Sequence, residues 1–226
     1  MNVFLPCRKG SSRIPRKNVR SLPGYDKGLL EIKLKQLLQI SKVDSIFLST
    51  NDEEIIDFAN TINDSKINII KRSEYLSSNQ TQTDELVAHV IDIVKGGDVI
   101  WTHVTSPFFN IQCYERAIEE YYLSIDNGFD SLMSVNRLQG FFWNKTHPLN
   151  YNREKQKWPQ TQNIESIFEI NSACFIANID IYKEFHDRIG KKPYFFETDK
   201  ISGLDIDWED DFVIAESILR NRINNI

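Results

Sequence analysis

Apolar residues along the chain fall into short continuous runs separated by longer stretches with helical spacing. Continuous runs of strand length occur at residues 2–7, 45–49, 68–70, 98–104 and 130–135. Stretches with apolar residues three and four positions apart occur at residues 29–40, 52–61, 84–94 and 111–125. The second of these helices is expected to start at an N-cap on Asn51 or Asp52. This alternation predicts a three-layer α/β/α sandwich around a mainly parallel, Rossmann-like sheet.

The alternation stops after Val135. Residues 137–162 lack helical spacing and contain Trp143, Pro148, Trp158 and Pro159, so we expect loops and short strands outside the main sheet. This excursion either contacts a second copy of the chain or packs as a flap on its own domain. The remaining predicted elements are a strand at 169–177, a helix at 179–187, a short aromatic segment at 192–198 and a helix at 209–223. We expect one domain over residues 1–226.

The composition is that of an ordinary globular protein, with 226 residues, 41% of them hydrophobic and 26% charged. No apolar stretch is long enough to span a membrane and the start does not read as a secretory signal, so we expect a cytoplasmic protein without a membrane partner. The three scattered cysteines, Cys7, Cys113 and Cys174, give no disulfide framework and no zinc spacing. A formal net charge of -5 argues against general nucleic-acid binding.

Positive charge is nevertheless concentrated just after the first predicted strand. Six basic and no acidic residues lie from Arg8 to Arg20, with Gly10, Ser11 and Ser12 among them. Open α/β sheets bind ligands at this edge, and cations beside free backbone N–H groups suit a polyphosphate. A solvated basic surface is the alternative. Neither GxxxxGK[ST] nor GxGxxG is present, which excludes a P-loop and makes a dinucleotide-dependent oxidoreductase a poor fit.

A pair of carboxylates precedes the last helix. Asp205 and Asp207 are two residues apart, so an extended backbone points both to one side and Ile206 to the other. Such a pair suits Mg²⁺ beside substrate phosphates, although solvation alone explains it equally well. Asp210 and Asp211 fall in the first helical turn, where the helix dipole favours negative charge and a structural role. A phosphate loop and a carboxylate pair together are the parts that nucleotidyl transfer needs.

A third candidate segment closes the strand at 98–104 and turns at Pro107. The hydroxyls of Thr105 and Ser106 are placed either to meet a ligand at the sheet edge or to cap the turn. His103, at the same edge, is a candidate ligand contact or proton acceptor, although a lone histidine is more often structural.

These motifs, in this order, resemble the acylneuraminate (CMP-sialic acid) cytidylyltransferase family over nearly the whole chain. The opening run is similar to the family's R-x-x-S-K-G-[IL]-P-x-K-N signature, matched at Arg8, Ser11, Ile14, Pro15, Lys17 and Asn18. Further matches, in chain order, are residues 49–52, 72–76 and 105–107, Asn171, the Phe195–Phe196 pair and the Asp205-Ile-Asp207 triplet.

The resemblance implies a nucleotidyltransferase fold and a Mg²⁺-dependent enzyme that transfers CMP from CTP to an acidic, sialic acid-like sugar with release of pyrophosphate, for surface glycan synthesis. It implies catalytic roles for Arg8, Lys17 and Asp207 and metal binding by Asp205 and Asp207. The implied nucleotide-binding residues are Arg8, Gly10, Ser11, Ser12, Arg13, Lys17, Asn18, Arg72, Thr81 and Thr83. The implied sugar-binding residues are His103, Thr105, Ser106, Asn171, Phe195 and Phe196.

The resemblance also implies a homodimer formed through residues 137–162, in which each subunit lends the Phe195–Phe196 pair to its partner's sugar site. The proton acceptor is left open among a metal-bound water, Asp207 and His103.

The chain departs from the family pattern mostly on the sugar side. His103 replaces the usual Gln, while Glu169 and Ser172 flank Asn171 where Arg or Pro and Gly are common. In the phosphate loop Ser12 replaces a Lys, for which the neighbouring Arg13 is a possible substitute. A cytidylyltransferase for Kdo or a non-sugar acid, and a non-catalytic nucleotide-binding relative, are therefore the alternatives; the retained carboxylate pair argues against the second.

Overall fold

The computed structural model describes residues 1–11, 13–78 and 80–223, with the backbone alone at 222 and 223. It contains a seven-stranded sheet in the order β3-β2-β1-β4-β6-β5-β7. The strands are β1 (Asn2–Pro6), β2 (Ser45–Thr50), β3 (Ile67–Lys71), β4 (Asp98–Thr102), β5 (Ser131–Leu138), β6 (Ile167–Asn178) and β7 (Pro193–Thr198). Only β6 runs antiparallel to its neighbours, so the mainly parallel sheet is confirmed.

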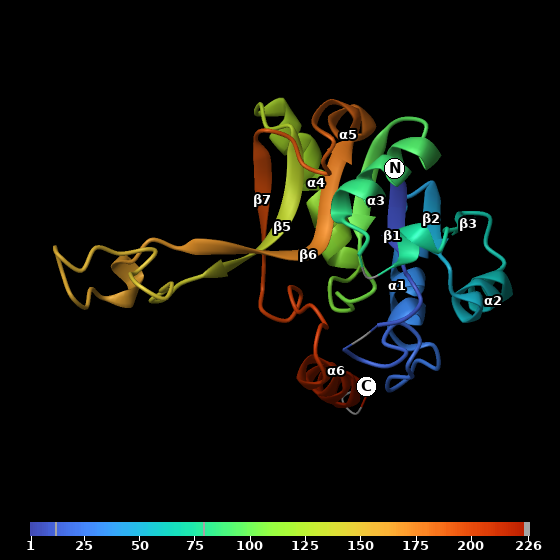
Figure 1. Cartoon of the computed structure of the whole chain (residues 1–226), viewed down its shortest axis with the longest axis horizontal. Coiled ribbons are helices and arrows are strands. Elements are labelled where there is room, and N and C mark those ends of the chain that lie inside the picture. The colour runs from blue at the N-terminus through green and yellow to red at the C-terminus, as the bar shows by residue number, and fades with distance from the viewer. Residues whose placement is uncertain (12, 79, 224–226) are drawn as a thin grey trace.

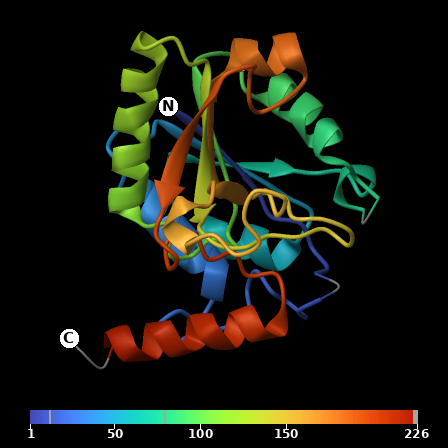
Figure 2. The same cartoon turned by 90° about the vertical axis from the view of Figure 1, so that its left-hand side faces the viewer.

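Helices cover both faces of this sheet, which confirms the three layers. They are α1 (Gly28–Leu38), α2 (Glu53–Ile62), α3 (Thr83–Ile93), α4 (Ile111–Asp126), α5 (Ile179–Phe185) and α6 (Glu209–Ile223), with short 3-10 turns at Tyr75–Ser77 and Thr161–Asn163. One core unites α1, α2, α4 and α6 with the sheet, and the second unites α3 and α5 with its other face. Figure 2 shows α4 and α3 on opposite sides of the strands.

Side-chain alternation along the strands divides these two cores. In β1, Val3 and Leu5 belong to the first core and Phe4 to the second, and all three side chains are fully buried. Of the two N-caps expected for α2, the structure has Asp52, whose carboxylate accepts the Glu54 N–H at 3.1 Å.

The excursion expected after β5 is a long arm that leaves the body of the molecule between β5 and β6 (Figure 1). Pairing of Leu138 with Ile167 ends the ladder, so the first two residues of the predicted segment still belong to β5. Inside the arm, the Phe141 ring packs edge-on against Tyr151 and Trp158, with centroids 5.1 and 5.3 Å apart. Trp158 remains 66% exposed, which leaves an apolar surface on the arm.

The loops that follow β1 and β4 meet the segment before α6 at the carboxyl edge of the sheet. There Ile206 N–H donates to the Thr105 carbonyl at 2.8 Å and Lys17 reaches the Ile206 carbonyl at 2.7 Å. Figure 1 shows α6 lying beneath this edge.

Among the described residues, no helix combines the length and the apolar character that crossing a bilayer would require.

Candidate active site

A cavity of about 370 Å³ opens at the carboxyl edge of the sheet. It brings together ten of the predicted site residues, from the loop after β1, the start of α3, the loop after β4 and the segment before α6. These ten are Arg8, Ser11, Arg13, Lys17, Asn18, Thr83, His103, Thr105, Asp205 and Asp207. Two lining residues were not predicted as site residues, Ser172 and Arg188.

The basic loop after β1 is held in place by side chains at its base. Asn18 Nδ2 donates to the Arg8 carbonyl at 3.0 Å, and Asn51 Oδ1 accepts the Lys9 N–H at 2.8 Å. Gly10 adopts φ +81°, a left-handed conformation that favours glycine, but it does not line the cavity. Ser12 lies outside the described residues.

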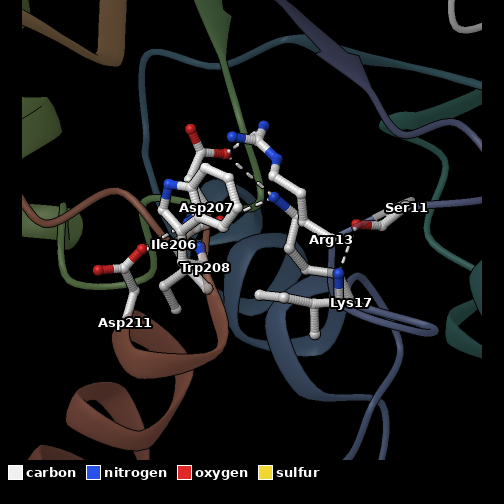
Figure 3. A network of polar contacts seen from close by, with 8 residues as sticks. Ser11, Arg13, Lys17, Ile206, Asp207, Trp208 and Asp211 are labelled. Carbon is white, nitrogen blue, oxygen red and sulfur yellow. Dashed lines mark hydrogen bonds and ion pairs between the residues drawn. The ribbon is translucent and has the colours of Figure 1, made fainter.

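Asp207 joins the basic loop to the segment before α6. Its Oδ1 lies 3.0 Å from Arg13 Nη2 and 3.3 Å from Lys17 Nζ, and Figure 3 shows both cations converging on this carboxylate. The Lys17 side chain is buried whereas that of Asp207 is 41% exposed, so the pair is only partly shielded from solvent. Asp211 Oδ2 accepts the N–H groups of Asp207 and Trp208 at 3.0 and 2.8 Å, which confirms its structural role at the start of α6.

Asp205 faces the same cavity from a more buried position. Ile206, between the two carboxylates, is fully buried on the opposite side, as the extended spacing predicted. Burial raises the pKa of Asp205, while a hydrogen bond from the Thr105 side chain favours its charged form. Its Oδ1 is buried and accepts no hydrogen bond from any described residue.

These two carboxylates fit a Mg²⁺ ion that is shared with substrate phosphates. Asp205 lines the cavity, and its buried Oδ1, without a hydrogen-bond partner among the described residues, retains lone pairs that a metal ion could use. The described residues form no group of three or more His, Cys, Asp and Glu side chains able to hold a metal alone. Mg²⁺ commonly takes one or two carboxylates and completes its shell with phosphate oxygens and water.

His103 lines the cavity as a neutral imidazole. Trp101 Nε1 lies 3.0 Å from His103 Nε2, and because an indole N–H can only donate, Nε2 accepts and the proton resides on Nδ1. The pKa of His103 is lowered to about 3, mainly by burial and further by the positive charges of Arg188 and Lys17. Among the three proton acceptors left open by the sequence, this arrangement disfavours His103, because its only acceptor nitrogen is occupied.

Three other residues expected to bind the nucleotide lie in three separate places. Thr83 lines the main cavity, whereas Thr81 lies in a separate hollow and donates to the Tyr75 carbonyl at 2.8 Å. Arg72 is only 4% exposed, yet within the described chain its Nε and Nη2 donate no hydrogen bond. A buried guanidinium with unmatched donors is costly unless a ligand supplies the acceptors.

A second cavity of about 500 Å³ adjoins the first and shares Ser172, Asp205 and Asp207 with it. Asn171 lines this second cavity, but its amide has no capacity left for a sugar. Its two N–H donors serve Asn136 and Thr198, while its Oδ1 accepts from Ser134 and the Ala173 N–H. The structure gives Asn171 a structural role in place of the predicted sugar contact.

Phe196 and Ser106 were also expected to contact the sugar, but both side chains are buried. Phe196 is fully buried, with its ring centroid 5.9 Å from that of Phe109, because alternation along β7 turns it into the core. Its neighbour Phe195 faces outward, 39% exposed, and packs on Phe168. Ser106 is also fully buried and does not line the cavity.

Ser172 has a left-handed backbone, with φ +58°, at the wall between the two cavities. This conformation favours glycine and is uncommon for other residues. The only signal in the sequence was the family's common glycine at this position. Arg188 gave no sequence signal.

Lys33, which no pattern in the sequence identified, supports the loop after β4. Its fully buried Nζ lies 2.9, 3.2 and 3.0 Å from the Ser106 carbonyl, the Phe109 carbonyl and Tyr114 Oη. Thr102 Oγ1 donates its only proton to the Ala173 carbonyl. Tyr114 Oη must therefore donate to Thr102 Oγ1, and it accepts a hydrogen bond from Lys33 Nζ. All three contacts then require the protonated amine, although burial lowers the pKa of Lys33 to about 7.

A sheet of this topology, with a basic loop after its first strand facing a carboxylate pair, defines a nucleotidyltransferase. The sequence model of the family described as cytidylyltransferase matches residues 3–202, and the chain belongs to that family.

Named relatives agree with this assignment. The chain is 25% identical over 191 residues to a pseudaminic acid cytidylyltransferase of Campylobacter jejuni subsp. jejuni serotype O:2, covering 80% of this chain and 79% of the relative. It is 26% identical over 217 residues to an N-acylneuraminate cytidylyltransferase of Streptococcus agalactiae serotype III, covering 93% of this chain and 51% of the relative. The chain thus spans about half the length of that second protein.

Solved structures share the fold. CMP:2-keto-3-deoxy-manno-octonic acid synthetase complexed with CTP superposes with a TM-score of 0.66 at 14% identity, over 97% of this chain and 98% of the other. The 4-diphosphocytidyl-2C-methyl-D-erythritol synthase of Anaerococcus prevotii gives the same TM-score at 11% identity, with the same coverage. At these identities the likeness supports the fold, and the expected nucleotidyltransferase architecture is confirmed.

Proposed function

We propose that the protein is a Mg²⁺-dependent enzyme that transfers CMP from CTP to an acidic sugar and releases pyrophosphate. One observation carries the proposal: two cations of the basic loop, Arg13 and Lys17, converge on Asp207 in the cavity that Asp205 also lines. This arrangement pairs phosphate-binding cations with metal-binding carboxylates at one point. Family membership supports CTP as the nucleotide.

In the proposed complex, the triphosphate lies along the basic loop. Arg8, Arg13 and Lys17 bind its oxygens, while Ser11 contributes a hydrogen bond. The Asp207 carboxylate now neutralises the cations that the phosphates would engage, so nucleotide binding exchanges one anion for another. Thr83 lines the same cavity and would lie beside the nucleotide, whereas Arg72 is buried and does not line the cavity.

The chemistry proposed is displacement at the α-phosphorus. A sugar hydroxyl oxygen bonds to this phosphorus, the bond to the bridging oxygen breaks, and pyrophosphate leaves with the electron pair. Mg²⁺ held by Asp205 and Asp207 would neutralise charge on the phosphate oxygens. Because His103 Nε2 is occupied, Asp207 or solvent would take the hydroxyl proton. The protein acts mainly by positioning the reactants and stabilising charge.

An acidic nine-carbon sugar is the proposed acceptor, for use in surface glycans. Relatives named for pseudaminic acid and for N-acylneuraminate are 25% and 26% identical to the chain, so similarity does not decide between them. Kdo and a non-sugar acid are the alternatives within the same reaction. A non-catalytic role is disfavoured because both carboxylates line the cavity.

We also propose a homodimer through the arm. Phe141, Trp143 and Trp158 are 38%, 46% and 66% exposed, and the arm extends away from the body of the molecule (Figure 1). A second copy covering these rings would remove them from water. Phe195, also partly exposed, is then available to a neighbouring subunit.

Nucleotide selectivity tests the first half of the proposal. The melting temperature of the purified protein is measured with CTP, UTP, ATP and GTP in turn, each with Mg²⁺, because a ligand that binds only the folded state raises it. We expect a shift with CTP that exceeds the others. A preference for another base, or no shift with any nucleotide, would contradict the assignment of CTP.

A further inference from the structure

Arg188 lies in the loop between α5 and β7, and its side chain lines the main cavity. The guanidinium carbon is 3.7 Å from the Phe175 ring centroid and 5.1 Å from that of Trp101. Both rings project from strands, β6 and β4, into the core beneath α3 and α5. The cation is therefore held against a rigid aromatic shelf, which orients it without using its N–H groups.

Those N–H groups are available to a ligand. In the part of the chain that the structure describes, the Arg188 side chain forms no hydrogen bond and no ion pair; the adjacent Asp187 carboxylate instead accepts the Arg188 backbone N–H at 2.6 Å. The side chain is half-buried, and burial lowers the pKa of Arg188. An arginine deprived of water in this way gains from an anion that pairs with its planar donors.

The carboxylates of the cavity do not pair with Arg188. Asp207 is shared by Arg13 and Lys17, and Asp205 lies on the same segment. Beside Arg188, the neutral His103 contributes only an Nδ1–H donor, because Trp101 occupies Nε2. One wall of the cavity therefore provides phosphate-binding cations and carboxylates, and another provides a guanidinium and a neutral donor.

We propose that Arg188 binds the carboxylate of the acceptor and thereby sets the preference for an acidic substrate. The inference rests on the proposed function, in which the phosphate-binding wall is occupied by CTP. A carboxylate matches the two parallel N–H donors of a guanidinium, whereas a hydroxyl or an ester does not. Arg188 is thus assigned as a specificity-determining residue for the acceptor.

The test varies the charge at position 188 and the charge of the substrate independently. Arg188→Met keeps an apolar side chain against Phe175 and Trp101. Arg188→Lys keeps the positive charge but lacks the paired N–H donors of a guanidinium. The control, Arg116→Met, removes an arginine that stacks on Phe196 outside the cavity. Initial rates are measured with CTP and either N-acetylneuraminate or its methyl ester. We expect Arg188→Met to raise KM for the acid about 10- to 100-fold and to leave KM for CTP and for the ester within about twofold.

Arg188→Lys should fall between wild type and Arg188→Met, and Arg116→Met should behave as wild type. An equal loss with acid and ester, or a rise in KM for CTP, would overturn the assignment. Calorimetric titration of N-acetylneuraminate, pseudaminate and Kdo into the protein, with and without CTP, separates this inference from the proposed reaction.

If the wild-type protein binds an acid and Arg188→Met does not, but no pyrophosphate is released, the proposed reaction is rejected and the anion site at Arg188 is retained. Binding of no acid by the wild-type protein would overturn the site itself.

Discussion

Lys17 Nζ lies 3.3 Å from Asp207 Oδ1, although 190 residues separate the two along the chain. The same nitrogen is 2.7 Å from the Ile206 carbonyl, so Lys17 fixes both the backbone and the carboxylate of the segment before α6. Through this contact the loop after β1 and the start of α6 form one site.

Asp207→Asn should reduce pyrophosphate release by at least about a thousandfold. The amide keeps the size of the side chain but removes the charge that would bind Mg²⁺ and pair with Arg13 and Lys17. Initial rates at saturating Mg²⁺ and CTP measure the effect, with Asp210→Asn, an exposed carboxylate one turn away, as the matched control. Wild-type turnover by Asp207→Asn would exclude the metal assignment.

His103→Gln should leave the shape of the pH–rate profile between pH 5 and 8 unchanged. His103 is neutral throughout this range, because burial and neighbouring cations lower its pKa to about 3, and Trp101 holds its acceptor nitrogen. The folded state therefore binds fewer protons than the unfolded state below pH 6.5, and this residue costs stability as the pH falls from 6.5. Disappearance of a rate-limiting ionisation in His103→Gln would show that His103 acts as a base.

Lys33 should make the protein more stable as the pH rises from 7 to about 10. Burial lowers the folded-state pKa of Lys33 from 10.5 to about 7, so within this interval the unfolded state binds more protons and the free energy of unfolding increases with pH. Tyr114 and Cys174, which surround the amine, have pKa values raised by burial and stay neutral over this range.

Urea unfolding at pH 7 and pH 9.5 measures this increase. Lys33→Met should reduce the increase, while Lys42→Met, an exposed residue near the end of α1, should not. An increase of equal size in Lys33→Met would show that other groups cause it.

Ser172→Gly should stabilise the fold and Ser172→Val should destabilise it. A left-handed conformation costs a non-glycine residue about 1–2 kcal/mol, and the greater freedom of glycine in the unfolded state offsets part of the gain. We expect the free energy of unfolding to rise by up to about 1 kcal/mol in Ser172→Gly. Ser172→Val, which is β-branched, should fall below wild type. Chemical denaturation ranks the three proteins, and the order Val above Ser would contradict the strain.

The layers of the fold and the centre of the site could be predicted because they depend on local patterns. Period-two spacing in β1 divides Val3 and Leu5 from Phe4, and the same rule turns Asp205 and Asp207 to one side of Ile206. Strand direction is not encoded in that pattern, so the reversal of β6 was missed.

The errors have the same physical origin. The Phe195–Phe196 pair is adjacent in sequence, but a strand sends one ring outward and the other into the core. Asn171 was assigned by its place in a motif, whereas its role depends on four partners that only the tertiary structure assembles. Arg188 and Lys33 contact residues that are distant in the sequence, from segments without a local motif, so no sequence pattern identifies them.

Formation of a CMP-sugar from CTP is the measurement that tests the central claim most directly. The wild-type protein is incubated with CTP, Mg²⁺ and, separately, pseudaminate, N-acetylneuraminate and Kdo, and the products are followed by ³¹P NMR. We predict pyrophosphate and a CMP phosphodiester in equal amounts with at least one of the acids, and neither product with UTP, ATP or GTP. Absence of a phosphodiester with every acid, while CTP binds, would contradict the claim that this protein is a cytidylyltransferase for acidic sugars.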